Sequence, residues 1–307
     1  MLLFTFTSCV QNNKKQTAQT DIDILTIGVM SSMDYLPLAV AQERGYFTEN
    51  NLEVIIQKFY SANERDAALQ SNNLDGTILD YTGGAIQVAG GIPLKFTSQC
   101  DGTFEMIVAP SSNITELAEL KGKKIAISRN TVIDFCTDMA LSLAGLSNND
   151  AEMVEINKIP LRLEMLNNSK IDATMIPDPF ATIAKSENNK AIISMDQMGI
   201  RVTGIAFHQK AIDEKSSALK KLYIAYNKAI EDLTKEPVSN FESLLVKEVR
   251  VPAGIVSNIV LPNYSKAQIP SESDLQSVDK WLKNKNLVPK NFDINSIVAS
   301  EIIDEVK

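Results

Sequence analysis

Short apolar runs alternate with amphipathic stretches along the first two thirds of the chain, and this alternation predicts strands and helices in turn. A first series places strands at 24–30, 52–59 and 76–81, each followed by a helical pattern, and closes with strands at 94–99 and 104–110. A second series begins at 123–128 and repeats the order of strand and helix as far as a strand at 201–208. The alternation is typical of βαβ units, so we expect an α/β fold with parallel sheets, followed by a mostly helical C-terminal third.

The two series contain similar segments at nearly the same spacing. "IGVMSS" at 27–32 resembles "IAISRN" at 125–130, since each is an apolar strand that ends at a serine before a helix. "LQSNNLDGTILD" at 69–80 resembles "LNNSKIDATMIPD" at 166–178. Two similarities in register indicate two similar α/β lobes. Ligands bind such sheets outside the carboxyl ends of the strands, so the cleft between the lobes is the expected site.

Polar side chains gather where the predicted strands end, and these are the candidate ligand-binding residues. Tyr81 offers a platform for a planar ligand, and Arg129 at a helix N-terminus is suited to hold an anionic group. On one wall we expect Ser31, Ser32, Asp34, Tyr35, Asn63, Asp80, Tyr81, Thr82 and Asp101, and on the other Ser128, Arg129, Asn130, Thr131, Asp178 and Phe180.

We also expect residues 61–65 on the first wall, and several residues of the predicted cleft also fit purely structural roles. Ser61 and Glu64 have the spacing of a capping box, and Asp178 before Pro179 has that of an N-cap. Arg129 fits a solvated surface position equally well. Because aspartates outnumber this arginine at the predicted cleft, a zwitterion or a heterocycle with donor groups fits better than a bare anion such as nitrate.

Composition and charge narrow the class of protein. The chain has 307 residues, of which 44% are hydrophobic and 22% charged, a profile typical of a globular protein with two domains. Its net charge of −8 and its scattered lysines and arginines argue against a nucleic-acid surface. No later segment approaches the roughly 18 consecutive apolar residues of a membrane span.

The N-terminus resembles the end of a bacterial lipoprotein signal. A short apolar block at 2–6 is followed by Thr7, Ser8 and Cys9 and then by the polar tract "QNNKKQTAQT". We therefore expect residues 1–21 to be a signal remnant and tether, with lipid attached to Cys9 outside the cytoplasm. The alternative is an apolar start with an incidental cysteine.

The remaining cysteines and the single histidine do not form a recognisable reactive or metal-binding pattern. Cys100 and Cys136 are expected to be buried thiols, and His208 to lie at the surface or at a hinge. We expect neither a metal site nor a cofactor, and no catalytic motif of a hydrolase, nucleotide-binding enzyme or metalloprotease is present.

Four segments resemble the substrate-binding proteins of ABC importers for nitrate, alkanesulfonates, taurine and the pyrimidine precursor of thiamine. They are "YLPLAVAQERGYFTENNLEV" (35–54), "SANERDAALQSNNLDG" (61–76), "LAELKGKKIAIS" (117–128) and "NNSKIDATMIPDPF" (167–180). The resemblance runs from about residue 25 to residue 180, and the segment around "AQERGYFTENNLEV" is the most specific part.

This resemblance implies the two-lobed type II periplasmic-binding-protein fold, with two crossing hinge strands. The crossings are expected near Met106-Ile107-Val108 and Val202-Thr203-Gly204, which makes lobe one 22–107 plus 203–307 and lobe two 108–202. It also implies a monomer that closes on a small solute and delivers it to an ABC permease.

Two other classes of protein remain as alternatives. Enzymes that make the thiamine pyrimidine share the fold, but they carry a cysteine-rich stretch and an active-site histidine that this sequence lacks. The effector domain of a transcription factor is a third possibility, against which the lipoprotein-like start and the lack of an N-terminal helix-turn-helix argue.

Overall fold

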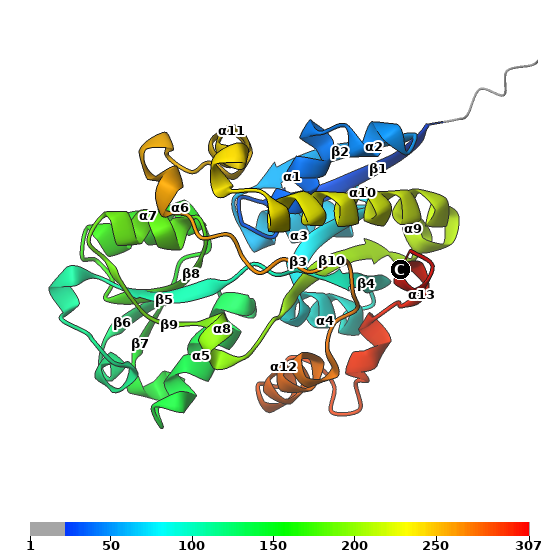
Figure 1. Ribbon diagram of the computed structural model, residues 1–307. Helices are drawn as coiled ribbons and strands as arrows, with labels where there is room; N and C mark the ends of the chain where they lie inside the picture. The colour runs from blue at the N-terminus through cyan, green and yellow to red at the C-terminus, as the bar shows by residue number, and fades with distance from the viewer. Residues whose placement is uncertain (1–21, 307) are drawn as a thin grey trace, which may run out of the picture.

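The computed structural model describes residues 22–306, which form two five-stranded sheets (Figure 1). The first sheet has the strand order β2-β1-β3-β10-β4 and the second the order β7-β6-β8-β5-β9. The strands of the first sheet are β1 (Asp23–Met30), β2 (Leu52–Phe59), β3 (Gly76–Asp80), β4 (Leu94–Gln99) and β10 (Thr203–His208). Those of the second are β5 (Phe104–Val108), β6 (Lys124–Ile127), β7 (Glu152–Glu155), β8 (Ala173–Pro177) and β9 (Lys190–Ser194).

Helices follow most of the strands, as the alternating pattern predicts. Those of the first two thirds are α1 (Leu36–Glu43), α2 (Tyr46–Glu49), α3 (Ala62–Gln70), α4 (Tyr81–Ala89), α5 (Val132–Leu143), α6 (Ile159–Asn167), α7 (Phe180–Ser186) and α8 (Met195–Met198). The C-terminal third contains α9 (Gln209–Glu214), α10 (Ser216–Lys235), α11 (Glu242–Leu244), α12 (Glu272–Asn284) and α13 (Glu301–Asp304). The longest, α10, buries the stripe Leu219, Leu222, Tyr223, Tyr226 and Ile230 against α1 and the first sheet.

The internal repeat is visible in the hydrogen bonding of both sheets. In the first, the Thr77 hydroxyl of β3 donates to Gly28 O of β1 at 2.8 Å. In the second, the Thr174 hydroxyl of β8 donates to Ala126 O of β6 at 2.9 Å. Strands β1 and β3 pair in parallel in the first sheet, as β6 and β8 do in the second. Each sheet also contains one antiparallel strand from the other series, β10 in the first sheet and β5 in the second. The predicted pair of similar α/β lobes is confirmed.

The first crossing between lobes lies earlier than predicted. Met106, Ile107 and Val108 belong to β5, which pairs with β8 and β9 in the second sheet, so the predicted crossing there is wrong. The chain passes between the sheets at residues 100–103, directly after β4. The second crossing falls at residues 199–202, just before β10 and close to the predicted Val202-Thr203-Gly204.

The C-terminal third does not stay with the first lobe alone. A short helical turn at Ala253–Asn258 packs against α7 of the second lobe. Residues 259–270 then run back in extended form, seen in orange in Figure 1, and α12 packs against α4 of the first lobe. The Tyr264 hydroxyl anchors this return by donating to Met33 O at 2.8 Å.

The histidine and cysteines are buried. Cys100 and Cys136 are free thiols that are nearly inaccessible, as expected. His208 is only 7% exposed and its Nε2 lies 2.8 Å from Leu69 O, so its expected surface or hinge position is wrong. Between residues 22 and 306 no helix is both long and apolar enough to cross a membrane. The predicted tether at 1–21, with Cys9, lies outside the described residues.

Candidate functional site

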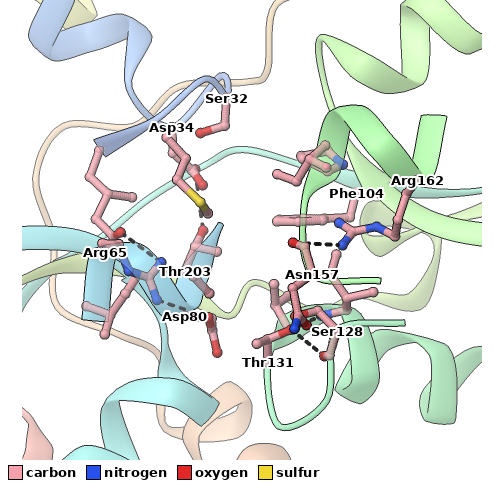
Figure 2. Close-up of a pocket in the computed structure, with 18 residues that line it drawn as sticks. Ser32, Asp34, Arg65, Asp80, Phe104, Ser128, Thr131, Asn157, Arg162 and Thr203 are labelled. Atoms are coloured by element: carbon pink, nitrogen blue, oxygen red, sulfur yellow. Dashed lines mark hydrogen bonds and ion pairs between the residues drawn. The ribbon is translucent and has the colours of Figure 1, made fainter. Parts of the chain in front are cut away.

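A cavity of about 590 Å³, its open mouth included, lies between the two lobes (Figure 2). Most of its wall is apolar, with polar groups contributed by both lobes. The first lobe supplies Met30, Ser32, Asp34, Ala62, Arg65, Ile78, Leu79, Asp80 and Thr203, and the second supplies Phe104, Ser128, Thr131, Val132, Ile133, Asn157, Ile159, Arg162 and Pro177.

Two arginines occupy equivalent helices on opposite sides of this cavity, Arg65 on α3 and Arg162 on α6 (Figure 2). Each is 1% exposed and lies on the buried face of its helix. On α6 the buried residues Ile159, Arg162, Leu163 and Leu166 have the spacing of one helical face. Helix periodicity therefore directs both guanidinium groups inward.

Arg162 carries a buried positive charge without a carboxylate to offset it among residues 22–306. Its Nη1 donates to Ile156 O at 2.8 Å and Asn157 O at 3.4 Å, and its Nε has no hydrogen-bond partner. Burial lowers the pKa of Arg162 to about 10, which still leaves the side chain cationic at neutral pH. A buried, uncompensated cation in a cleft favours an anionic ligand group.

Arg65 differs because its charge is offset within the first lobe. Its Nε donates to Asp66 at 2.8 Å, its Nη1 donates to Ile78 O at 3.2 Å, and its Nη2 lies 4.0 Å from the Asp80 carboxylate. Arg65 is therefore held mainly by the protein itself.

Two carboxylates line the first lobe's wall. Asp80 caps α4 by accepting hydrogen bonds from Gly83 N at 2.8 Å and from the Thr82 hydroxyl. Asp34 accepts from Gly102 N at 2.6 Å and from the Thr203 hydroxyl at 3.3 Å. Burial nevertheless raises the pKa of Asp34 to about 6, so this carboxyl group titrates just below neutral pH.

The loop that precedes α5 supplies polar side chains to the second lobe's wall. The Ser128 hydroxyl donates to Asn157 Oδ1 at 3.0 Å, and Thr131 caps α5 by accepting from Ile133 N at 3.2 Å. These contacts fix the hydroxyl and amide groups that face the cavity.

Comparison with known proteins identifies the family. The profile of the NMT1/THI5-like family matches residues 32–240, which is more than half of the chain. The chain belongs to the NMT1/THI5-like family.

Two curated relatives resemble this family member in sequence, and a solved structure resembles it in fold. A Haemophilus influenzae protein named for thiamine biosynthesis is 32% identical over 126 residues, or 40% of each chain. An Escherichia coli K12 protein named for binding aliphatic sulfonates is 25% identical over 196 residues, covering 62% of this chain and 60% of the relative. The aligned parts thus span less than two thirds of either relative. The crystal structure of the E. coli periplasmic aliphatic sulphonate binding protein SsuA has a TM-score of 0.75, with 18% identity over 91% of this chain and 92% of that one.

Several residues predicted from the sequence lie together in the cavity of this NMT1/THI5-like protein. They come from both lobes and are Ser32, Asp34, Asp80, Ser128 and Thr131. Thr82 is buried beside Asp80 and contributes through its hydrogen bond to that carboxylate. Ser31 and Phe180 line a neighbouring groove between the lobes.

Other predicted residues lie away from the cavity, each for a local reason. The Tyr35 hydroxyl donates to Glu248 at 2.9 Å, and Tyr81 packs edge-on against Phe96 with ring centroids 4.8 Å apart. Asp101 pairs with Arg201 at 2.6 Å between the two crossing segments, and Arg129 is exposed beside Glu155 at 3.2 Å. Asn63 and Asn130 are exposed, while Asp178 is buried and accepts hydrogen bonds from Thr182. The predicted Ser61 cap of α3 is confirmed, with Glu64 N donating to its hydroxyl.

Sequence reasoning placed residues 61–65 on the cleft wall without selecting Arg65 as a ligand-binding residue, and it missed Arg162. Asn157, Thr203 and Phe104 also line the cavity but were not candidates. For Arg162 a signal existed, since it shares a helical face with Ile159, Leu163 and Leu166. An arginine on the apolar stripe of a helix calls for a buried partner or a ligand.

Proposed function

We propose that the protein binds a small solute between its two lobes, as the extracytoplasmic substrate-binding component of an ABC importer, and that Arg162 holds an anionic group of the solute. The single observation that carries this proposal is the buried Arg162 guanidinium in the cleft, with no carboxylate partner in the described chain. Binding between lobes fits closure around the ligand, since the residues that line the cavity come from both.

The chemistry of the wall narrows the solute. Around Arg162 the lining is largely apolar, and the carboxyl groups of Asp34 and Asp80 lie on the opposite lobe. A solute with one anionic group, an apolar body and a hydrogen-bond donor satisfies all three features, as a zwitterion or a substituted heterocycle would. Nitrate would leave the apolar wall without a contact and would offer no hydrogen-bond donor to either carboxyl group.

The cellular setting of the proposal rests on the sequence and on the names of the relatives. Attachment of lipid to Cys9, delivery to a permease and action as a monomer are proposed on the lipoprotein-like N-terminus and on the periplasmic sulphonate-binding protein of similar fold.

An enzyme of thiamine-pyrimidine synthesis is the second candidate, because a relative is named for thiamine biosynthesis. The groups near the cavity favour binding over catalysis. The single histidine bonds to Leu69 O outside the cavity, and burial raises the pKa of both the Cys100 and Cys136 thiols, which disfavours the reactive thiolate. Turnover of an aminopyrimidine by the purified protein would favour the enzyme.

The test is a thermal-shift screen of sulfonates, taurine, nitrate, aminopyrimidines and amino acids, followed by calorimetry on the best compound. We expect Arg162→Met to weaken that compound at least about 30-fold, because removing a buried, hydrogen-bonded charge from a complex costs about 2 kcal/mol or more.

Arg129→Ala is the matched control, since Arg129 is a cation of the same lobe that lies exposed beside Glu155. It should leave the affinity unchanged. Equal losses in the two variants, or binding that does not depend on Arg162, would contradict the proposal.

A further inference from the structure

A second hollow adjoins the cavity and shares part of its wall. This groove has a volume of about 400 Å³, its open mouth included, and, like the cavity, lies between the lobes. Met30 and Ile159 line both spaces, so the groove continues the cavity toward the surface. The side chains that define the groove beyond them are Phe59, Tyr60, Phe180 and Arg250.

The groove is lined by aromatic rings from both lobes. Phe59 and Tyr60 follow each other at the end of β2, and Phe180 begins α7 on the other side. Tyr60 is 44% exposed, so much of its side chain is accessible to a ligand in the groove. A second aromatic ring that packs against such a ring adds about 0.5–1.5 kcal/mol of favourable interaction free energy beyond that due to the buried area.

Arg250 is held over this groove by a strained piece of backbone. It ends a π-helical turn, Leu245–Val249, and has φ of 69°, which is uncommon for a residue with a side chain. Its guanidinium carbon lies 5.0 Å from the centroid of the Tyr60 ring, and it pairs with no carboxylate of residues 22–306. Wide helical turns and left-handed residues both concentrate at functional sites.

From these contacts we infer that the groove is a subsite for an aromatic ring carried by the same solute whose anionic group lies at Arg162. The solute is then an anionic compound in which an apolar chain passes Met30 and Ile159 and ends in a ring between Tyr60 and Phe180. A planar ring fits here because both the aromatic side chains of the groove and the guanidinium group of Arg250 can stack against a planar ring. This inference rests on the proposed function, which supplies the anionic end.

The test uses sulfonates of defined length as probes. Calorimetry compares alkane-1-sulfonates with ω-phenylalkane-1-sulfonates of one to four methylene groups, and the matching carboxylates with and without the ring. We expect one phenyl compound to bind at least about fivefold more tightly than its ring-free partner. Tyr60→Ala should weaken the binding of that compound about three- to tenfold and leave the affinity for the ring-free sulfonate unchanged.

Ile55→Ala is the control, since Ile55 lies on β2, the strand that leads to Tyr60, with 43% exposure but outside the groove. This variant should bind both the phenyl compound and the ring-free sulfonate as tightly as wild type does. The inference is overturned if no phenyl compound binds better than its ring-free partner, or if Tyr60→Ala and Ile55→Ala behave alike. If no compound of either series binds, the anion at Arg162 is wrong and the proposed function fails instead.

Discussion

At the scale of single residues, the site depends on the residue next in sequence to each of two equivalent arginines. Arg65 precedes Asp66, whose carboxylate accepts from its Nε and lies 2.7 Å from its Nη2. Arg162 precedes Leu163, which faces the core and offers no charge. One residue thus separates an arginine whose charge is paired within the fold from one whose charge has no carboxylate beside it in the described chain. A ligand that brings the missing negative charge gains a charge-assisted hydrogen bond in a poorly solvated place.

The same scale explains why Arg129 was a candidate and Arg162 was not. Arg129 stands in a serine-rich loop after a strand, which predicts a ligand-binding loop from pattern alone. Its direction depends on the turn, where Asn130 adopts φ of 61° and Arg129 lies beside Glu155 on the neighbouring strand. The order of strands and helices does not predict in which direction the Arg129 side chain points. Arg162 has the pattern of a charged position on an amphipathic helix, and only its apolar neighbours at helical spacing indicate that it lies on the buried face.

Asp34 gives a prediction about pH. Folding raises its pKa from 3.8 to about 6, so between these values the native state holds a proton that the unfolded chain has lost. The contribution of this group to stability is therefore greatest below pH 4, falls as the pH rises toward 6, and is constant above that. Asp34→Asn keeps an acceptor for Gly102 N but does not titrate. Between pH 4 and pH 7.5 we therefore expect the difference in free energy of unfolding, variant minus wild type, to increase by about 2.4 kcal/mol.

Urea unfolding followed by fluorescence of the single tryptophan, Trp281, measures this difference. Other titrating groups are common to both proteins and largely cancel. A stability difference that stays constant across the pH range would mean that Asp34 titrates as it does in the unfolded chain.

At the scale of elements, the sequence predicts the strands and helices well because most of them carry a clear period. The internal repeat also predicts two similar lobes, and the matching parallel pairs β1 with β3 and β6 with β8 confirm that correspondence. The hydrophobic pattern does not indicate to which of the two sheets a buried strand belongs. The strand Phe104–Val108 would be mostly buried in either sheet. Its pairing with β8 and β9 depends on contacts with residues roughly 70 to 90 positions away along the chain.

The first crossing segment gives an element-scale prediction. Gly102 lies so close to Asp34 that an added Cβ would come within 2.4 Å of Oδ1. Gly102→Ala must therefore displace Asp34 and break the hydrogen bond from Gly102 N. We expect a loss of about 1–3 kcal/mol in the free energy of unfolding, measured by urea titration at pH 7.

Gly254→Ala is the matched control, because a Cβ added there meets no atom within 4 Å. It should change stability by less than about 0.5 kcal/mol. Similar stabilities for the two alanine variants would show that the crossing segment yields freely around Asp34.

At the scale of the whole molecule, the lobes touch at several places besides the crossing segments. Met33 N donates to Asp178 O at 3.2 Å, and Lys158 lies 3.4 Å from Glu64 at the exposed surface. A further contact is made by α12, where Trp281 Nε1 donates to Asp138 of α5 at 2.7 Å. Opening of the lobes has to break such contacts, so their strength biases the equilibrium between open and closed forms that the proposed function requires.

Lys285 at the end of α12 tests this bias without touching the ligand cavity. Its Nζ lies 2.7 Å from Asp138 and 3.1 Å from Asp134 on α5, and it stacks over the Trp281 ring. Lys285→Ala should lower the population of the closed form, so that the best ligand of the screen binds about two- to tenfold more weakly and the ligand-free radius of gyration rises. Calorimetry and small-angle scattering measure the two effects. Lys283→Ala serves as the control, since Lys283 pairs with Asp279 within α12. If both lysine variants bind and scatter like wild type, α12 moves with the second lobe and the contact does not govern closure.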